Sequence, residues 1–443
     1  MHPLIVIITV SVFVWWLWIR MKPRHKLPPT YPGGLPLLGN VLQLPRNPTE
    51  AWNKEKKLVE FSLKSGGVAL ATIFTHRFYV LSDPDDSLLV SNTCLGKPYL
   101  YNVGEDMYKT GLVTASVSSW KPHRKLLNPA FNQQVMNSFL DVFNDQARTL
   151  VTELAAETEK DAFDMEKYLM SVVLKTSCQT SLGLNTEKDN SMLNDYVAAT
   201  TELIDLYFER LIKLWLHLKF LFNISSLKKK QDILIKTLKD ISQEVIRRKI
   251  ESKLKKENKN IQGSHDTVPD KFEPLLDRIF NLSETEGAFT NDEIQDHVNT
   301  IIASSYATTG ITILFVLILI GSREDVQSRL LQELNEVFQG EDRNVTKSDL
   351  QKLVYLEAVI KESLRLYPPS PRFARSVKTD IKLKQYTLEA GSTCIISIHA
   401  INRHPMWGAD ADQFRPERWL DPASLPDNPN AFASFCLGRR NCI

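Results

Sequence analysis

The chain of 443 residues predicts a mainly α-helical protein with small β-sheets, and three observations support this fold class. Apolar residues recur with helical spacing over most of the stretch from Trp120 to Leu366. Two shorter stretches, residues 68–81 and 380–399, are β-rich, and the second alternates apolar with polar residues. Hydrophobic residues make up 43% and charged residues 24%, which is an ordinary globular balance, and the net charge of +2 predicts no nucleic-acid partner.

The first segment of the chain is predicted to be a membrane anchor. Residues 4–19 are apolar except for Thr9 and Ser11, and the basic residues follow this run instead of preceding it. A cleaved signal peptide carries its positive charge before the apolar run, and a basic flank stays on the cytosolic side of a membrane. We therefore expect residues 1–20 to be an uncleaved signal anchor with the body of the chain in the cytosol. The alternative is a helix that lies in the membrane interface.

The second segment, residues 21–40, is predicted to be a basic and proline-rich hinge. Its stretch 27–40 contains four prolines and three glycines, a density that excludes helix and stiffens the backbone. Two β-rich runs follow, Val68–Ile73 and Phe78–Leu81, and the short connection between them predicts a hairpin.

The body of the chain, residues 41–443, is expected to form one domain dominated by helices. Periodicity predicts helices over residues 120–127, 135–157, 165–182, 191–218, 228–256, 291–320, 323–338 and 347–366. Thr290 and Glu293 have the spacing of a capping box, so the long helix is expected to begin directly after Thr290. The polar residues 257–270 predict an exposed loop, and the second β-rich stretch runs from Asp380 to His399.

The last nine residues carry the most informative pattern of the chain, because Phe435, Gly438, Arg440 and Cys442 fall at relative positions 1, 4, 6 and 8. This spacing suits a loop that presents one thiolate to a metal. The glycine permits a tight turn, the arginine pairs with an anionic group beside the metal, and the phenylalanine packs against a flat apolar ligand. A haem with its propionates and an axial thiolate meets all of these requirements. The alternative is a structural cysteine near a surface turn.

A second motif places Glu362 and Arg365 three residues apart on one helix face, just before the prolines 368 and 369 that end the helix. Such a pair is common on protein surfaces and indicates little by itself. Arg418 follows in a Pro-Glu-Arg segment. We expect Arg418 to fold back and join Glu362 and Arg365 in a charge network.

The order of these motifs resembles the cytochrome P-450 (P450) superfamily, the haem-thiolate monooxygenases, over essentially the whole chain. The proline hinge, Trp120 with Arg124, the Thr308–Thr309 pair, the Glu-x-x-Arg motif, the Pro-Glu-Arg segment and the cysteine loop all occur in the family's order. The runs 120–131 and 297–309 are most similar to the microsomal branch that includes fatty-acid ω-hydroxylases and many insect enzymes. The resemblance implies the P450 fold and a location in the endoplasmic reticulum membrane.

The resemblance also implies a role for each matched residue. Cys442 is expected to be the axial iron ligand of the haem. The groups expected to neutralise or hydrogen-bond the haem propionates are Trp120, Arg124, Arg375 and Arg440. The expected structural triad is Glu362, Arg365 and Arg418. Thr308 is expected to be the distal hydroxyl that helps to deliver protons, although a helical threonine more commonly donates to the carbonyl four residues earlier.

The reaction that the resemblance implies inserts one oxygen atom from O2 into a lipophilic small molecule, with electrons from NADPH delivered by a partner reductase. The segments near 99–112, 203–221 and 369–373 are largely apolar and aromatic and are expected to line the pocket. A basic face is expected to steer an acidic partner, with solubility as its alternative role. This face would contain Lys121, His123, Arg124, Lys125 and Arg439.

Two departures from the family pattern lie on the long helix. The family usually has an acid at the position of Ala307 and a glycine at that of Ser305, so Thr308 lacks its acidic neighbour. Ordered water, Tyr306 or Ser304 is expected to assist Thr308 instead, or the enzyme uses an already oxidised substrate. The alternative function is therefore a haem isomerase or dehydratase of oxygenated lipids. Ser304 also replaces the glutamate that bonds covalently to haem in some ω-hydroxylases, so the haem is expected to be non-covalent.

The third departure is at the C-terminus, because the family continues beyond this point with a helix and a final β-hairpin. The sequence as given ends at Ile443, one residue after Cys442, and is expected to be C-terminally truncated. A cysteine at a frayed terminus is not preorganised, so haem binding is expected to be poor. An inactive fragment, or a protein that sequesters a ligand, is the remaining alternative.

Overall fold

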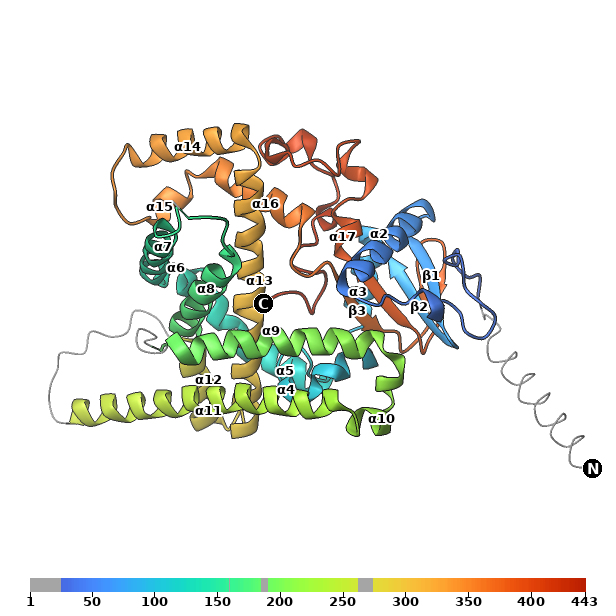
Figure 1. Ribbon diagram of the computed structural model, residues 1–443, viewed down its shortest axis with the longest axis horizontal. Coiled ribbons are helices and arrows are strands. Elements are labelled where there is room, and N and C mark those ends of the chain that lie inside the picture. The colour runs from blue at the N-terminus through green and yellow to red at the C-terminus, as the bar shows by residue number, and fades with distance from the viewer. Residues whose placement is uncertain (1–24, 159, 185–189, 262–273) are drawn as a thin grey trace, which may run out of the picture. The chain divides into compact units, whose positions relative to one another are not determined.

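The computed structural model describes residues 25–158, 160–184, 190–261 and 274–443, which Figure 1 shows in colour. The predicted membrane anchor, residues 1–20, lies outside the described residues. The chain divides into two compact units. Unit 1 contains the chain up to Pro98 with residues 372–406 and 428–441, and unit 2 contains residues 99–371, 407–427 and 442–443.

Unit 1 is built on a four-stranded sheet with the strand order β1-β2-β6-β3. The antiparallel strands β1 (Val68–Ile73) and β2 (His76–Leu81) form the predicted hairpin, and β2 begins two residues earlier than expected. Strand β6 (Thr393–Ser397) pairs in parallel with β2 and antiparallel with β3 (Arg372–Ser376). The periodicity did not indicate β3, because this five-residue strand contains two arginines and follows directly on a proline-rich stretch.

The second β-rich stretch is shorter than predicted. It contains the two-stranded sheet of β4 (Ile381–Lys382) and β5 (Thr387–Leu388), followed by β6. The expected strand to His399 was wrong, because the chain turns into the short helix α17 (Ile398–Ile401). The Ser397 side chain causes this change by accepting a hydrogen bond from the Ala400 amide as a helix cap.

Two helices of unit 1, α2 (Pro48–Lys64) and α3 (Pro84–Thr93), were not expected from the periodicity. Both begin with a side-chain cap followed by a proline, because Asn47 and Asp83 accept hydrogen bonds from amides of the first turn. Helix α2 packs against β1 and β2. Helix α3 buries Val90 in the apolar core of unit 1 and so fixes the position of its C-terminal end.

The proline-rich segment from Leu27 to Asn40 contains no helix, as predicted. It packs along β1 as part of unit 1: the Tyr31 amide donates to the Leu70 carbonyl at 2.7 Å, and the Asn40 amide donates to the Thr72 carbonyl at 2.6 Å. These backbone hydrogen bonds hold the segment on the edge of the sheet.

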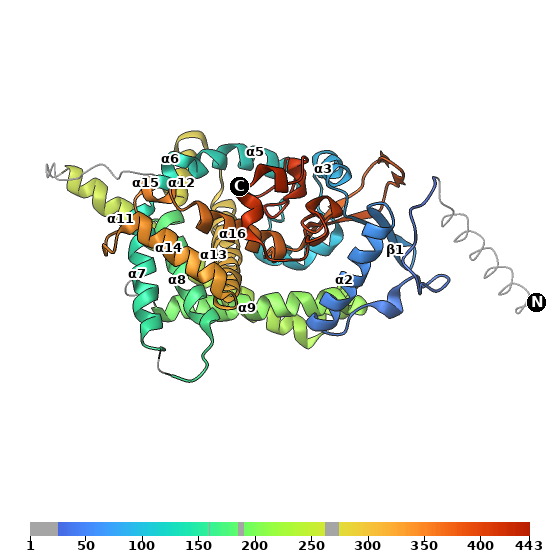
Figure 2. The ribbon, with the colours of Figure 1, turned by 90° about the horizontal axis from the view of Figure 1, so that it is seen from above.

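Unit 2 is helical, and its longest inner helix is α13 (Asn291–Gly321), which Figure 1 shows crossed by α9 (Asn190–Ile212) and α11 (Ser226–Ile261). Figure 2 shows α7 (Leu140–Ala155) beside α8 (Met165–Ser181). The remaining helices are α4 (Glu105–Tyr108), α5 (Val117–Leu127), α6 (Gln133–Ser138), α10 (Lys219–Asn223), α12 (Leu275–Glu286), α14 (Glu324–Phe338), α15 (Lys347–Leu350) and α16 (Val354–Leu366).

Several predicted helix boundaries in unit 2 were wrong. The predicted helix 135–157 is divided into α6 and α7 at Phe139, and 347–366 is divided into α15 and α16. The first of these two pieces, α15, is a single turn that begins with a capping box of Thr346 and Asp349. Helix α9 ends at Ile212 instead of Leu218, and α11 continues to Ile261 into the predicted loop 257–270, most of which lies outside the described residues.

Helix α13 begins as predicted, with the Thr290 side chain and the Glu293 amide joined in a capping box. Among the described residues it is the one helix that is long and apolar enough to cross a membrane. However, it buries Asp296, His297 and Asn299 within unit 2 and packs against α8. Polar groups buried between packed helices characterise α13 as a core helix of this unit.

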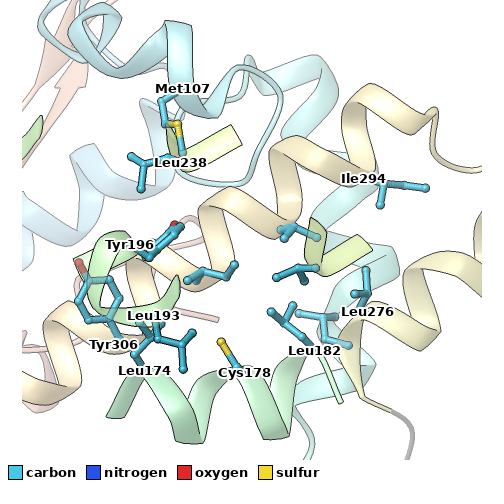
Figure 3. Packing of buried hydrophobic residues seen from close by; sticks show 14 of the residues in the cluster. Met107, Leu174, Cys178, Leu182, Leu193, Tyr196, Leu238, Leu276, Ile294 and Tyr306 are labelled. Carbon is cyan, nitrogen blue, oxygen red and sulfur yellow. The ribbon is translucent and has the colours of Figure 1, made fainter. Parts of the chain in front are cut away.

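The apolar core of unit 2 contains side chains of α8, α9, α12 and α13, as Figure 3 shows. Leu174 and Cys178 from α8 face Leu193 and Tyr196 from α9 in this core. Tyr306 of α13 is 2% exposed, and its ring meets that of Tyr196 edge to face with 6.2 Å between the centroids. This packing holds Tyr306 inside the helical core.

Candidate active site

The stretch that precedes Cys442 gathers buried positive charge in unit 1. Arg375 is 1% exposed and Arg440 is 7% exposed. The Arg375 guanidinium donates to the Arg440 carbonyl at 3.2 Å, and the Arg440 guanidinium donates to the Leu95 carbonyl at 3.0 Å. Burial, together with these two guanidiniums, lowers the pKa of Lys97 to about 7. Cations held this close together suit an anionic group such as a carboxylate pair.

The backbone of the same stretch requires Gly438. Its φ of 74° is in the left-handed region, and a Cβ at this position would lie 2.7 Å from Cβ of Ser91. The Asn441 amide donates to the Gly438 carbonyl at 3.2 Å and closes the turn. Phe435 is 56% exposed and touches Phe432 with ring centroids 6.5 Å apart. The apolar ring is therefore presented on the surface of unit 1.

Unit 2 places Cys442 beside an arginine of α5. Cys442 is exposed, and the Arg124 guanidinium donates to its backbone carbonyl at 3.0 Å. Burial lowers the pKa of Arg124, and the charge of the Cys442 thiolate opposes this shift. Trp120 is buried one helical turn before Arg124. The exposed thiol therefore belongs to a residue whose backbone is held by a guanidinium of α5.

The sequence-predicted ligand residues are thus found in two groups. Unit 1 contains Arg375, Phe435, Gly438 and Arg440, and unit 2 contains Trp120, Arg124 and Cys442. The chemistry of each group fits haem. The thiol is accessible to a metal, the arginines suit propionates, and the missing Cβ of Gly438 permits a tight turn before the ligand.

The three residues of the predicted triad meet in unit 2, where each is 0% exposed. Arg365 donates to both carboxylate oxygens of Glu362 at 2.8 Å, and Arg418 Nε donates to the same carboxylate at 2.8 Å. The Trp419 indole and the Arg415 amide also donate to Glu362, at 2.9 and 3.0 Å. Burial raises the pKa of Glu362, but these donors outweigh burial and the net pKa is lowered. The carboxylate is therefore held ionised.

The remaining donors of the two arginines bond to backbone carbonyls. Arg365 donates to the carbonyls of Ala411 and Gln413 at 2.6 and 3.2 Å. Arg418 donates to the carbonyl of Asp410 at 3.2 Å. This network ties α16 to the irregular chain after Trp407, so its geometry is that of a structural element.

Thr308 on α13 has the hydrogen bond that helical threonines commonly form. Its hydroxyl is exposed and donates to the Ser304 carbonyl at 2.8 Å. The Ser304 hydroxyl likewise donates to the carbonyl of Thr300. Tyr306, one of the groups expected to assist Thr308, is buried against Tyr196. The threonine oxygen retains its lone pairs to accept a hydrogen bond from water.

The predicted basic face loses one member, because His123 is buried and faces α13. Its Nδ1 lies 3.1 Å from Nε2 of His297, and its Nε2 lies 3.6 Å from a Glu293 oxygen. Burial, assisted by His123 and opposed by Glu293, lowers the pKa of His297 to about 4. Lys121 and Lys125 of the same helix are exposed. The only signal in the sequence was that His123 lies next to an exposed helical position. This signal did not reveal its contact with His297.

The chain as a whole matches a single family model, "Cytochrome P450", over residues 28–443. The chain therefore belongs to the cytochrome P450 family, whose members are haem-thiolate monooxygenases and hence oxidoreductases. The family implies a haem iron with a thiolate ligand as the cofactor.

Three curated proteins that are similar to the chain carry the names of cytochrome P450 4 members. Cytochrome P450 4V2 of Mus musculus is 29% identical over 96% of this chain and 81% of the relative. Cytochrome P450 4c21 of Blattella germanica is 27% identical over 96% of this chain and 85% of the relative. Cytochrome P450 4c3 of Drosophila melanogaster is 29% identical over 93% of this chain and 79% of the relative. The similarity to vertebrate and insect proteins agrees with the branch that the motifs indicated.

Proposed function

We propose that this chain is a membrane-anchored monooxygenase that inserts one oxygen atom from O2 into a lipophilic small molecule. Electrons come from NADPH through a reductase, and the anchor is residues 1–20 in the endoplasmic reticulum membrane. The observation that supports this proposal most directly is the cysteine loop, where an exposed thiol at Cys442 follows a turn containing the buried Arg440. A thiolate ligand supplies electron density to haem iron and favours O–O cleavage.

Each side chain of the proposed site has a task that its geometry supports. Cys442 would supply the thiolate that binds the iron. The residues that would pair with the propionates are Trp120, Arg124, Arg375 and Arg440, because charge-assisted hydrogen bonds from guanidiniums to carboxylates are strong. Gly438 permits the turn, and the exposed ring of Phe435 packs against the ligand. The triad of Glu362, Arg365 and Arg418 keeps α16 attached to the chain after Trp407 and takes no part in the reaction.

In this proposal, Thr308 positions a water molecule for proton delivery. Its hydroxyl hydrogen is directed to the Ser304 carbonyl, so its oxygen is available to accept a hydrogen bond from a water molecule. A water held in this way is oriented with one proton away from the helix.

The exposed Lys121 and Lys125 on α5 and the exposed Arg439 support an acidic reductase as the partner. The lipophilic substrate is supported by the apolar segments near 99–112, 203–221 and 369–373.

The reduced, CO-treated protein with haem tests this proposal. We expect the long-wavelength Soret band of thiolate-ligated haem in the wild type and its loss in Cys442→Ser. The matched control is Cys436→Ser, which changes the half-buried cysteine of the same loop and should retain the band. A histidine-type spectrum in the wild type, or equal loss in both variants, would contradict the assignment.

A second function is favoured by Ala307, because this position offers no acid beside Thr308. The chain would then isomerise or dehydrate an oxygenated lipid with the same haem. Turnover of a fatty-acid hydroperoxide without NADPH or reductase would support this function. Under the first function, NADPH-dependent turnover should dominate, and Ala307→Asp should increase it by supplying the missing acid.

A further inference from the structure

Helix α3 ends against the loop that leads to Cys442, and one side chain joins them. Asn92 lies in the last turn of α3, and its Oδ1 accepts a hydrogen bond of 3.1 Å from the Arg439 amide. Arg439 precedes Cys442 by three residues in the chain. The Asn92 carboxamide therefore binds the backbone of the cysteine loop directly.

The close approach of the two segments depends on Gly438. A Cβ at this position would lie 2.7 Å from Cβ of Ser91 and 3.0 Å from Oδ1 of Asn92. The helix end therefore fills the space that a side chain would need, and the loop passes over it with φ values of 64° at Cys436 and 74° at Gly438. Within the loop, the Cys436 amide donates to the Ala433 carbonyl at 2.8 Å and the Asn441 amide to the Gly438 carbonyl at 3.2 Å, and the Arg439 amide between them uses the acceptor on the helix.

The helix that supplies Asn92 is itself firmly held. Asp83 caps its first turn by accepting from two amides, and Val90 is fully buried in the core of unit 1 together with Leu437 of the loop. Asn428 also donates to Asp85 in the first turn at 2.6 Å. An acceptor on a fixed helix restrains the amide that it binds, so it restrains the direction in which the following residues leave the turn.

We propose that Asn92 is a positioning residue for the thiolate loop, which it holds through the Arg439 amide. This inference rests on the proposed role of Cys442 as the haem ligand. Asn92 does not touch the thiol, and its effect passes through the backbone of residues 439–442. Without its acceptor, the loop should release the thiolate from iron more readily, while the fold of unit 1 is kept by the core around Val90.

The experiment compares three variants of the haem-loaded full chain. Asn92→Leu removes the acceptor, Asn92→Asp keeps an oxygen at the same position, and Ser91→Ala is the matched control. The Ser91 hydroxyl donates to the Ser87 carbonyl within α3, so its loss leaves the loop contact intact. The readout is the ratio of thiolate-type to other CO complexes at increasing urea, with helical circular dichroism as the check on folding. If Asn92→Leu does not fold, Asn92→Ala takes its place in the experiment, because it removes the same acceptor.

We expect Asn92→Leu to shift this ratio about fivefold towards haem that has lost its thiolate, which is the effect of one neutral hydrogen bond. Asn92→Asp and Ser91→Ala should match the wild type. An unchanged ratio in Asn92→Leu, or an equal shift in Ser91→Ala, would overturn the inference. Absence of the thiolate-type band in the wild type would contradict the proposed function instead, so the two failures are distinguishable.

Discussion

At the residue scale, the central feature of the buried triad is the carboxylate of Glu362. One buried carboxylate accepts hydrogen bonds from Arg365, Arg418, Trp419 and the Arg415 amide. Two guanidiniums that are 0% exposed depend on its charge. Buried charges are tolerated only when they are paired and fully hydrogen-bonded, so this residue has little freedom to change.

We predict that Glu362→Gln lowers the free energy of unfolding by about 3–5 kcal/mol, because the substitution leaves buried guanidiniums without their counter-charge. Urea unfolding followed by circular dichroism measures the change. The control is Glu357→Gln on the same helix, whose exposed ion pair with Lys361 should be worth only about 0.3–0.5 kcal/mol. Similar losses in both variants would contradict a special role for the buried network.

The acid dependence of this carboxylate follows from its lowered pKa. Its stabilising effect is complete above the ordinary glutamate pKa of 4.5 and is lost as the pH falls through the lower pKa of the folded state. The Glu362→Gln variant should therefore lose less stability than the wild type when the pH is lowered below 4.5.

At the element scale, α13 is the helix on which unit 2 depends, because several polar side chains of its first half are buried. His297 meets His123 of α5, and Asp296 binds the segment before α5. These contacts fix neighbouring elements to one helix. The same helix carries Thr308 further along, so contacts in its first half support the position of the proposed site.

We predict that the histidine pair makes stability sensitive to mild acid. The pKa of His297 is about 4 in the folded chain, against an ordinary value of 6.5. The unfolded chain therefore takes up the proton first, and the free energy of unfolding should fall by up to about 3 kcal/mol between pH 6.5 and about 4. Urea unfolding at several pH values measures this slope.

His297→Gln should flatten the slope over this pH range, because the amide does not titrate and still donates to His123. His25→Gln is the control, since His25 is an exposed residue that pairs with Asp380. An unchanged pH slope in His297→Gln would exclude the pair as the acid-sensitive element.

A second prediction concerns the segment between α4 and α5. The Asp296 carboxylate accepts from the Thr110 amide at 3.1 Å and from its hydroxyl at 2.8 Å. Asp296→Ala should leave two donors without an acceptor, cost about 1–3 kcal/mol and raise amide hydrogen exchange in residues 109–115. Asp292→Ala, at an exposed position of the same helix, should leave the exchange unchanged. Equal exchange in both variants would show that the segment is held by other contacts.

At the scale of the whole molecule, the chain combines a helical unit with a sheet-based unit, and the proposed ligand residues belong to both. The chain leaves and re-enters unit 1 twice, so residues distant in sequence complete each unit. Each group of proposed ligand residues depends on the fold of the unit to which it belongs. Substitutions in either unit are therefore expected to affect haem binding.

The predicted anchor is tested at this scale by removing residues 1–20, which leaves a chain that begins at Met21. We expect the shortened protein to shift from the membrane fraction to the aqueous fraction, because it loses an apolar run flanked by basic residues. Flotation with phospholipid vesicles measures the change, and the CO spectrum checks that the body is retained. Full retention on vesicles would show that the body itself supplies the main membrane contact.

The local patterns predicted local structure well where each element had its own signal. The hairpin of β1 and β2 and the start of α13 after Thr290 were confirmed, because β-rich runs with a short connection and a capping box depend on neighbouring residues. Helices α2, α3 and α12 and strand β3 were missed. Their apolar faces are recognisable only against the sheet and core that they cover.

The sequence by itself determined the family and the residue types of the proposed site, because the spacing from Phe435 to Cys442 and the order of the other motifs are properties of the chain. Tertiary structure decided which side chains meet. It buried His123 against His297, placed Tyr306 in the core and brought Asn92 to the Arg439 amide. Sequence spacing does not predict these contacts, because each joins two segments that are far apart in the chain and meet only when it folds.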